Sequence, residues 1–421
     1  MTGKAAGLPV LVAGGGVAGM QAALHLADAG VPVVLAEREG FLGGQVFRLD
    51  KVYPTDHCAF CPVWPKARAC RSHPLIRLRL KARLETVEED GEGTVAVLRV
   101  APDAVDADRC VFCGRCMAAC PRGAVVGRPD DIPHDPSTAP RAIVLDDLCD
   151  GCGACAAACP ASAIEKSALG RREPSFERIP VRTVVHATGF REPVPHPAPE
   201  FGAGTHPDIL TAMAFEKLTA EFAKGDGPLR CPSDGRPAKS VAFVQCAGAR
   251  DMRHIPHCSA VCCMHASKHA RWLKRRDPSL DVAIYHTDLR TPGKGQEAYM
   301  RAARAEGVRF FHARPGLVAP LDQQRAKGVL LRHEAAEKVA STVVDLVVLN
   351  GGLACNPSTV DGATPGNGTD SGRPGISRAC GFCREPADIA RSVIQAGAVV
   401  AALLQELADC VPGDAMEASR G

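Results

Sequence analysis

Cysteine is the residue type in this sequence that most clearly could do chemistry, since 20 of the 421 residues are cysteines. Eight of them form two runs, Cys110, Cys113, Cys116 and Cys120 followed by Pro121, and Cys149, Cys152, Cys155 and Cys159 followed by Pro160. This C-x2-C-x2-C-x3-C-P spacing wraps three thiolates around one face of an iron-sulfur cube, and the fourth cysteine ligates the other cluster. The runs therefore predict two [4Fe-4S] clusters with crossed fourth ligands, held by Cys110, Cys113, Cys116 and Cys159 and by Cys149, Cys152, Cys155 and Cys120.

A further group of cysteines lies in a later stretch, at Cys246, Cys258, Cys262 and Cys263. They separate a predicted strand, 240–245, from a predicted helix, 264–274, in a βαβ unit. In a pyridine-nucleotide enzyme a Gly-x-Gly-x-x-Gly loop would follow such a strand, and here thiols replace it. Four thiolates at a strand end and an adjacent helix start can converge, and the helix N-terminus offsets part of their negative charge. The group predicts a third [4Fe-4S] cluster, with buried inert thiols as the alternative interpretation.

A nucleotide-binding pattern opens the chain. Residues 9–13 predict a strand, and Gly14, Gly16 and Gly19 then form a Gly-x-Gly-x-x-Gly turn into a predicted helix. A second strand ends at Glu37, about twenty residues beyond the first glycine. In this fingerprint the glycines allow a tight turn, close approach of a pyrophosphate and close helix packing, and the acid accepts ribose hydroxyls. The motif predicts a dinucleotide site and does not separate NAD from FAD.

A second buried-strand pattern ends in Ala187-Thr188-Gly189. The triplet resembles the second flavin-side signature of two-dinucleotide-domain flavoproteins, whose type member is thioredoxin reductase. A triplet of this kind can also be an ordinary strand-end turn. Together with the first motif it favours FAD, with Thr188 and Gly189 as contacts.

Composition and charge exclude several classes of protein. Hydrophobic residues make 46% and charged residues 23% of the chain, which is a globular mix. The net charge of +3 is too small to nominate nucleic acid or an anionic membrane as partner. The longest apolar run, 396–404, is far shorter than the roughly 20 residues of a membrane-spanning helix. Residues 8–13 lead into the glycines without a cleavage site, so they predict a strand and not a signal peptide.

These features predict a cytoplasmic protein with no direct membrane span, or one that lies at the periphery of the inner membrane through its partners. In a reducing compartment, so many cysteines favour metal or redox ligation over a disulfide framework.

Four segments together carry a more specific resemblance. They are Tyr53 to Cys61, Cys246 to Cys263, Asp288 to Gly295 and Pro386 to Ile389. In sequence and in order they resemble the A subunit of heterodisulfide reductase over nearly the whole chain. Compared with the methanogen form, we expect a chain without the N-terminal extension and the C-terminal ferredoxin module. It is nearer in size to compact relatives such as the A subunit of quinone-interacting membrane-bound oxidoreductase complexes.

The resemblance implies further site residues. Gly44 and Asp388 are expected to contact FAD, and the family's cluster site carries over to the group at Cys246 to Cys263. Lys294 is a weaker candidate for a flavin-side cation, with a solvated loop lysine as the alternative. Cys58 and Cys61 match a family pair that is either a partner-facing cluster site or a packed pair. The roles of Cys380 and Cys383 stay open, and the cysteines expected to be structural are Cys70, Cys231, Cys355 and Cys410.

The predicted fold class is α/β, a two-dinucleotide-binding-domain flavoprotein (thioredoxin-reductase-like, Rossmann-type) with an inserted bacterial 2[4Fe-4S] ferredoxin domain. The expected divisions are an FAD-binding first segment at 1–104, the ferredoxin insert at 105–168, an FAD-binding second segment at 169–238, a second Rossmann-like domain at 239–350 and an FAD-binding closing segment at 351–421.

The first functional hypothesis is an electron-transfer iron-sulfur flavoprotein subunit of a heterodisulfide-reductase-like or quinone-interacting redox complex, able to bifurcate or confurcate electrons. Its expected partners are the other subunits, with a ferredoxin or a membrane haem subunit and a homodimer of heteromers as further options. One alternative is a self-sufficient NAD(P)H-dependent oxidoreductase related to the glutamate synthase small subunit. A non-catalytic assembly scaffold is the third.

Overall fold

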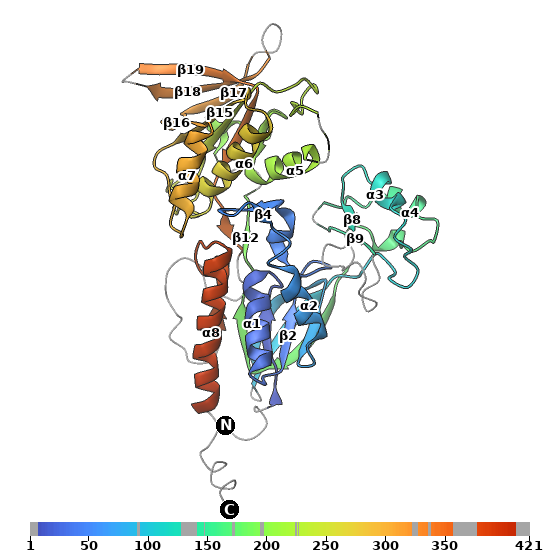
Figure 1. Cartoon of the computed structure of the whole chain (residues 1–421). Helices are drawn as coiled ribbons and strands as arrows, with labels where there is room; N and C mark the ends of the chain where they lie inside the picture. Colours follow the sequence, from blue (N-terminus) through green and yellow to red (C-terminus); the bar gives the residue numbers. More distant parts are fainter. Residues whose placement is uncertain are drawn as a thin grey trace, which may run out of the picture.

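Two layered domains and a smaller lobe make up the molecule (Figure 1). The computed structural model describes residues 7–90, 93–127, 141–146, 148–170, 173–193, 198–223, 225, 227–321, 327–335, 338–356 and 377–409. We refer to the lower layered body in Figure 1 as the first domain, to the upper one as the second domain and to the lobe at the side as the insert.

The first domain is built on a parallel five-stranded sheet with the order β22-β11-β1-β2-β5. Its strands are β1 (Val10–Ala13), β2 (Val33–Ala36), β5 (Ile76–Arg79), β11 (Thr183–His186) and β22 (Ser377–Ala379). The central strands are short apolar runs because both of their faces are covered. One face carries α1 (Val17–Asp28), α2 (Trp64–Ser72) and α8 (Ile389–Asp409), and the other carries the antiparallel strands β6 (Ala82–Asp90), β7 (Gly93–Val100) and β10 (Ser175–Val181).

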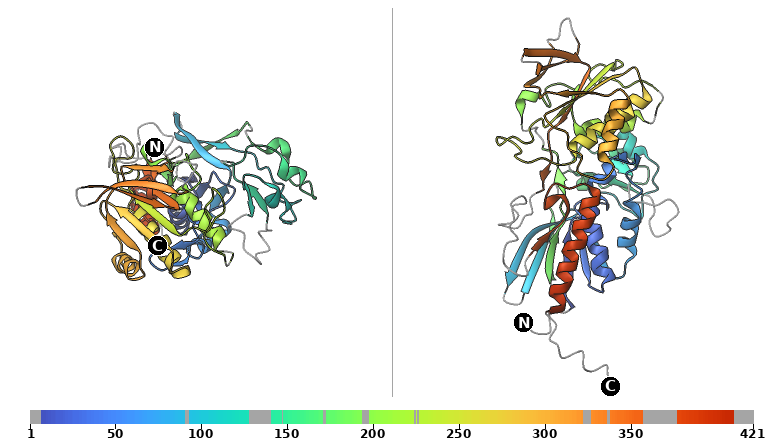
Figure 2. Two further views of the ribbon diagram at one scale, coloured as in Figure 1. Left: turned by 90° about the horizontal axis from the view of Figure 1, so that it is seen from above. Right: turned by 60° about the vertical axis from the view of Figure 1, so that its left-hand side comes forward.

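Helix α8 bears on the expectation that no segment of the chain is long and apolar enough to span a membrane. Residues Ile389–Ala408 are long and apolar enough to cross a membrane by length and composition alone. Counting uninterrupted apolar runs misses this helix, because Arg391 and Gln395 break the run without making its average polar. In the fold, Ala396, Val399 and Leu403 are buried in the core beside α1 (Figure 2). One such helix among the described residues is weak evidence for a membrane span; 28% of the apolar window is buried in the fold.

The insert leaves the first domain after β7 and returns at β10, and it projects to one side of the molecule (Figure 2). It contains α3 (Arg115–Ala119), α4 (Ala154–Ala157) and a hairpin of β8 (Val125–Gly127) with β9 (Ala142–Val144). A bridge between Val105 and Ile164 closes its base. The buried Lys81 of the first domain donates to the carbonyl of Val144 at 2.8 Å and pairs with Asp146 at 2.9 Å.

The second domain repeats the layer plan of the first with a parallel sheet of order β13-β20-β14-β15-β16. The strands are β13 (Ile209–Thr211), β14 (Ser240–Gln245), β15 (Asp281–His286), β16 (Arg309–His312) and β20 (Leu346–Asn350). Helices α5 (Ala212–Phe222), α6 (Cys262–Arg276) and α7 (Gln296–Ala305) cover one face, and the antiparallel strands β17 (Leu317–Pro320), β18 (Val329–Ala335) and β19 (Lys338–Val344) cover the other.

The expected division at residue 239 needs a correction. Strand β13 pairs with β20, with Ile209 opposite Val347, so the chain has entered the second domain by Ile209. This strand is three residues long, too short for its apolar pattern to indicate which sheet it joins.

Candidate functional site

A cavity of about 500 Å³ lies at the carboxyl ends of β1, β2 and β11. This is where open parallel sheets bind dinucleotides. Seven of the eight predicted flavin contacts line it: Gly14, Gly16, Glu37, Gly44, Thr188, Gly189 and Asp388. The structure thus brings together residues from segments that are far apart in the sequence.

The three glycines of the turn have different roles. Gly14 has a φ of 116°, and a Cβ there would lie 2.3 Å from the carbonyl oxygen of Ala187. Gly19 does not line the cavity; a Cβ on it would lie 1.8 Å from the carbonyl oxygen of Gly14, so it allows α1 to pack against β1. A Cβ on Gly16 would meet nothing within 4 Å, which leaves open space at the start of α1. Such a cradle fits a pyrophosphate at a helix N-terminus.

Glu37 is buried beside this turn. Its carboxylate accepts the backbone N–H groups of Gly15 at 2.6 Å and of Glu39 at 2.9 Å. Burial raises the pKa of Glu37 to about 7, although these two hydrogen bonds oppose the shift. The side chain predicted to hold a ribose therefore also holds the glycine turn in place.

The closing segment of the chain wraps around the second flavin signature. Asn356 donates its backbone N–H to the carbonyl of Gly189 at 3.1 Å and its side-chain amide to the carbonyl of Thr188 at 2.6 Å. Asp388 accepts the N–H of Arg391 at 2.8 Å in the first turn of α8. Helix α8 therefore starts at the cavity, where the positive end of its dipole favours an anionic ligand.

The cysteines of the insert meet in the crossed pattern. One small cavity is lined by Cys110, Cys113, Cys116 and Cys159, which is the first expected ligand set. Burial raises the pKa of Cys155, and the nearby sulfurs of Cys120 and Cys149 raise it further. The fourth cysteines of the two runs make equivalent hydrogen bonds. Cys120 Sγ accepts the backbone N–H of Ala124 and Cys159 Sγ accepts that of Ala163, both at 3.3 Å.

The third cysteine group also converges. Burial raises the pKa of Cys262, and the sulfurs of Cys263, Cys246 and Cys258 raise it further. Cys262 and Cys263 begin α6, and Cys246 follows β14 directly. The four thiols thus lie where the first turn of a nucleotide-binding βαβ unit would be. Thiolates at such a point suit a cluster whose negative charge a helix N-terminus offsets.

Lys294, in contrast, is exposed and does not line the flavin cavity. The turn that contains Lys294 is nevertheless close to the cavity. Two residues later, Gln296 Nε2 donates to Oδ2 of Asp388 at 3.5 Å, and Asp388 lines the cavity. Its role as a flavin-side cation stays a prediction, and its exposure favours an ordinary loop lysine.

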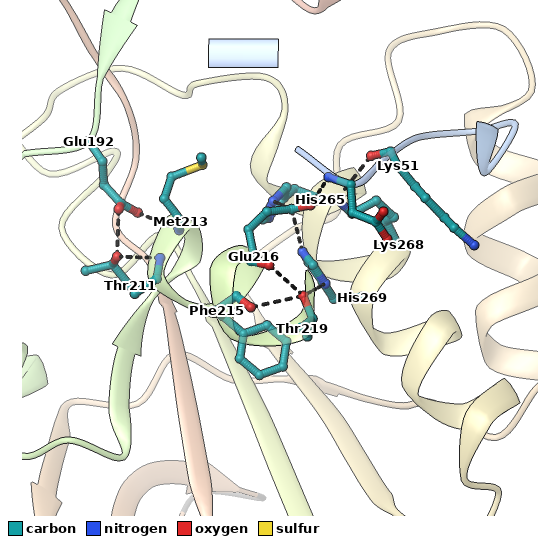
Figure 3. A network of polar contacts seen from close by, with 12 residues as sticks. Lys51, Glu192, Thr211, Met213, Phe215, Glu216, Thr219, His265, Lys268 and His269 are labelled. Carbon is teal, nitrogen blue, oxygen red and sulfur yellow. Dashed lines mark hydrogen bonds and ion pairs between the residues drawn. The ribbon is translucent and has the colours of Figure 1, made fainter. Parts of the chain in front are cut away.

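A buried charge network that the sequence alone did not indicate lies between the two domains (Figure 3). Glu216 of α5 has no exposed surface and accepts hydrogen bonds from His265 at 2.8 Å, His269 at 2.7 Å and Lys268 at 2.6 Å. Lys268 also donates to the carbonyl of Lys51 in the first domain at 3.2 Å. A cluster of polar residues on the buried face of an amphipathic helix is the signal that could have found it.

The remaining cysteines fall into three groups. Cys58 and Cys61 are both exposed, which favours a partner-facing pair over a packed pair. The second group lies at the flavin cavity: the buried Cys380 lines it, the buried Cys383 donates its S–H to the carbonyl of His186 at 3.3 Å, and Cys355 donates to that of Phe382 at 3.1 Å. The buried Cys70 and Cys231 are consistent with structural roles, and Cys410 lies outside the described residues.

Comparisons with protein families agree with the two kinds of site. Residues 109–164 match the 4Fe-4S dicluster domain, and residues 9–49 match the FAD dependent oxidoreductase family. The curated relatives include an iron-sulfur A subunit of the CoB–CoM heterodisulfide reductase of Methanopyrus kandleri, which is 35% identical over 94% of this chain and 64% of its own length. The A subunit of the ferredoxin:CoB-CoM heterodisulfide reductase of Methanosarcina mazei is 34% identical over 83% of this chain and 45% of its own length.

The chain is a relative of the A subunit of heterodisulfide reductase. This confirms the predicted resemblance, and the two family matches confirm the predicted FAD and 4Fe-4S domains of an oxidoreductase. The chain spans about half to two thirds of the length of the heterodisulfide reductase subunits it matches.

Solved structures confirm the predicted fold class. Thioredoxin reductase from Lactococcus lactis aligns with a TM-score of 0.54 at 13% identity, covering 96% of this chain and 99% of that enzyme. Thioredoxin reductase from T. acidophilum aligns with a TM-score of 0.53 at 12% identity, covering 95% and 98%. At this identity the likeness shows the fold alone.

Proposed function

We propose that this chain is an electron-transfer subunit that passes electrons between FAD and three [4Fe-4S] clusters in a heterodisulfide-reductase-like complex. The names of its relatives and the pairing of a flavin cavity with cysteine sites support this function. When bound, FAD exchanges two electrons with a donor or acceptor and single electrons with clusters.

The main support for this proposal is the packing of Tyr53 beside the third cysteine group. Tyr53 packs against the apolar group around Cys263, Met264 and Tyr299. Burial raises the pKa of Tyr53, and the nearby carboxylate of Asp388 and the sulfurs of Cys262 and Cys263 raise it further. The geometry agrees: Gln296 Nε2 lies 3.5 Å from Oδ2 of Asp388, which lines the flavin cavity, and Tyr299 of the same helix packs beside Cys263, so the two sites are close together. That proximity suits direct electron transfer between the two sites.

The residues around the third cysteine group would shape its chemistry. Buried apolar side chains, among them Met264 and Met300, exclude water on one side. Burial raises the pKa of Cys246, and the positive charge of Arg250, which forms an ion pair with Asp288, opposes that rise by favouring the thiolate. Burial and nearby charge are two of the factors that set a cluster's reduction potential.

The insert is the part that we expect to face a partner. Cys113 and Cys152 are exposed, as are the apolar side chains of Val111, Phe112 and Leu148 next to the two runs. Solvent-exposed apolar groups beside a redox site are typical of a docking surface. We propose that the partners are other subunits of the complex, with a ferredoxin or a membrane haem subunit as candidates, in the cytoplasm or at the membrane periphery.

The test is iron quantification and EPR on the anaerobically purified full chain and on its Cys262→Ser/Cys263→Ser variant. Three clusters of four irons predict about twelve irons in the native protein and about eight in the variant. Cys231→Ser is the matched control, since Cys231 is buried in the same domain, and it should keep all three clusters. Eight irons in both proteins, together with steady-state NADH or NADPH oxidation by the chain alone, would contradict the proposal and favour a self-sufficient oxidoreductase.

A further inference from the structure

His186 is a buried histidine in the wall of the flavin cavity whose ring has no partner among the described residues. It ends β11, and 3% of its surface is exposed. Neither Nδ1 nor Nε2 makes a hydrogen bond, and the residue lines the cavity. Buried polar atoms in folded proteins nearly always have a partner, so two orphaned ring nitrogens indicate a bound group.

The neighbours of His186 leave room in front of its ring. The parallel register aligns His186 with Ala13 of β1 and Ala379 of β22, and Ala13 aligns with Ala36 of β2. His186 thus lies between two alanines at the carboxyl edge of the sheet, in a register row that continues through Ala36 to Arg79 of β5. Small side chains in such a row are what a ligand that lies across the strand ends requires.

The backbone of His186 is held firmly. Its carbonyl accepts the N–H of Cys380 at 2.9 Å and the S–H of Cys383 at 3.3 Å. These bonds join β11 to the closing segment of the chain. A side chain on a rigid strand end is suited to positioning a ligand.

The ionisation state of His186 limits what it can bind. Burial lowers the pKa of His186 to about 4, so the ring is neutral at physiological pH. A neutral imidazole offers one N–H donor and one acceptor nitrogen. Hydroxyl groups match both functions, whereas phosphate oxygens match only the donor.

The sheet order indicates which part of a dinucleotide would pass the ring. Glu37 follows β2, the glycine turn follows β1, and His186 ends β11 on the other side of β1. With ribose at Glu37 and pyrophosphate at the glycine turn, the next part of FAD in the direction of β11 is the polyhydroxylated ribityl chain. We infer that His186 is a FAD-binding residue that hydrogen-bonds the ribityl chain, an inference that rests on the FAD site of the proposed function.

The experiment compares His186→Leu and His186→Gln in the full chain with its clusters intact and its flavin removed. FAD and ADP are titrated separately, and the thermal midpoint of the flavin-free protein is measured. Leu should weaken FAD binding about tenfold, the equivalent of one hydrogen bond, and leave ADP binding unchanged. Gln, which keeps a donor and an acceptor, should recover most of the FAD affinity. His73→Leu, on a partly buried histidine of the same domain outside the cavity, is the control for FAD and ADP binding.

Stability gives the second readout. Because Leu removes two unpaired polar atoms, the flavin-free variant should be as stable as the native protein or more stable. Unchanged FAD affinity with a lower thermal midpoint would overturn the inference, since the ring would then be satisfied by water. Equal losses of FAD and ADP affinity would also overturn it, by assigning the ring to the ADP half. A native protein that binds no FAD at all would instead refute the proposed function.

Discussion

At the scale of single residues, two of the acids that line the flavin cavity, Asp388 and Glu37, are used differently. Asp388 accepts the backbone N–H of Arg391 at the start of α8. Glu37 is enclosed by its own domain, and its pKa is raised to about 7 because burial outweighs its two backbone hydrogen bonds. Because Glu37 also holds the glycine turn, its ionisation should make the stability of the first domain depend on pH.

The Glu37→Gln variant tests this coupling. The folded protein keeps the Glu37 proton up to about pH 7, whereas an unfolded chain releases it near its ordinary pKa of 4.5. The free energy of unfolding should thus fall as the pH rises from about 4.5 to about 7, by on the order of 3 kcal/mol. Gln does not titrate, so the flavin-free variant should lose this dependence in urea unfolding at pH 5 and pH 8.

Glu85→Gln is the control, because Glu85 lies on a strand outside the cavity and is partly exposed. It should keep the native pH dependence. If Glu37→Gln kept it as well, the buried carboxyl would not be the group that titrates.

At the scale of elements, the last cysteine of each run in the insert follows a short helix and lies near the other run. Gly114 and Gly153 precede α3 and α4 with φ angles of 79° and 81°, so both runs turn into their helices in the same way. Cys120 and Cys159 then lie just beyond these helices, each near the other run. This arrangement predicts which mutations damage the same cluster.

Double variants should distinguish crossed from local ligation. With crossed ligands, Cys120→Ser and Cys149→Ser affect one cluster, so the double variant should lose no more iron than either single variant, about four irons. Cys120→Ser with Cys110→Ser should lose about eight. The measurement is iron content with EPR of the reduced protein, and the opposite ranking of the two double variants would refute the crossing.

At the scale of the whole molecule, a hairpin of the first domain fastens it to the second. The hairpin of β3 (Lys51–Val52) and β4 (His57–Cys58) lies between the domains in Figure 1. Asp50 just before it donates its N–H to Glu216 at 2.8 Å, and Asp56 accepts the hydroxyl of Tyr299. Although burial alone would raise it, hydrogen bonds from His265 and His269 hold the pKa of Glu216 far below its usual range.

The Glu216→Gln variant should loosen this junction. It leaves the ammonium group of Lys268 buried without its counter-charge, and breaking a buried pair in this way typically costs about 3–5 kcal/mol. Hydrogen exchange by mass spectrometry should show faster exchange in residues 50–58, with the Asp50 amide the most affected. Glu297→Gln, at an exposed position on α7, should leave that exchange unchanged. Native exchange rates at residues 50–58 in Glu216→Gln would mean that the network does not hold the domains together.

The limits of the sequence are clearest at residues whose roles depend on distant partners. Lys294 is the cation expected near the flavin, yet it is exposed, while Lys268 is buried against Glu216, which lies 52 residues away in the sequence. His186 resembles any polar residue at a strand end until the row of alanines beside it is known. Strand β13 falls within the segment expected for the first domain, because three residues carry no information about which sheet they join.

The sequence by itself determined the cofactor classes and the fold class of this protein, and it predicted the cluster ligands. Glycine and cysteine motifs act over a few residues, so their spacing alone sets the local geometry. Only the tertiary structure decided which charged groups are buried, where the second domain begins and which side chains line the flavin cavity. Burial and pairing depend on contacts between segments that are distant in the chain, and the spacing of residues within one segment carries no record of them.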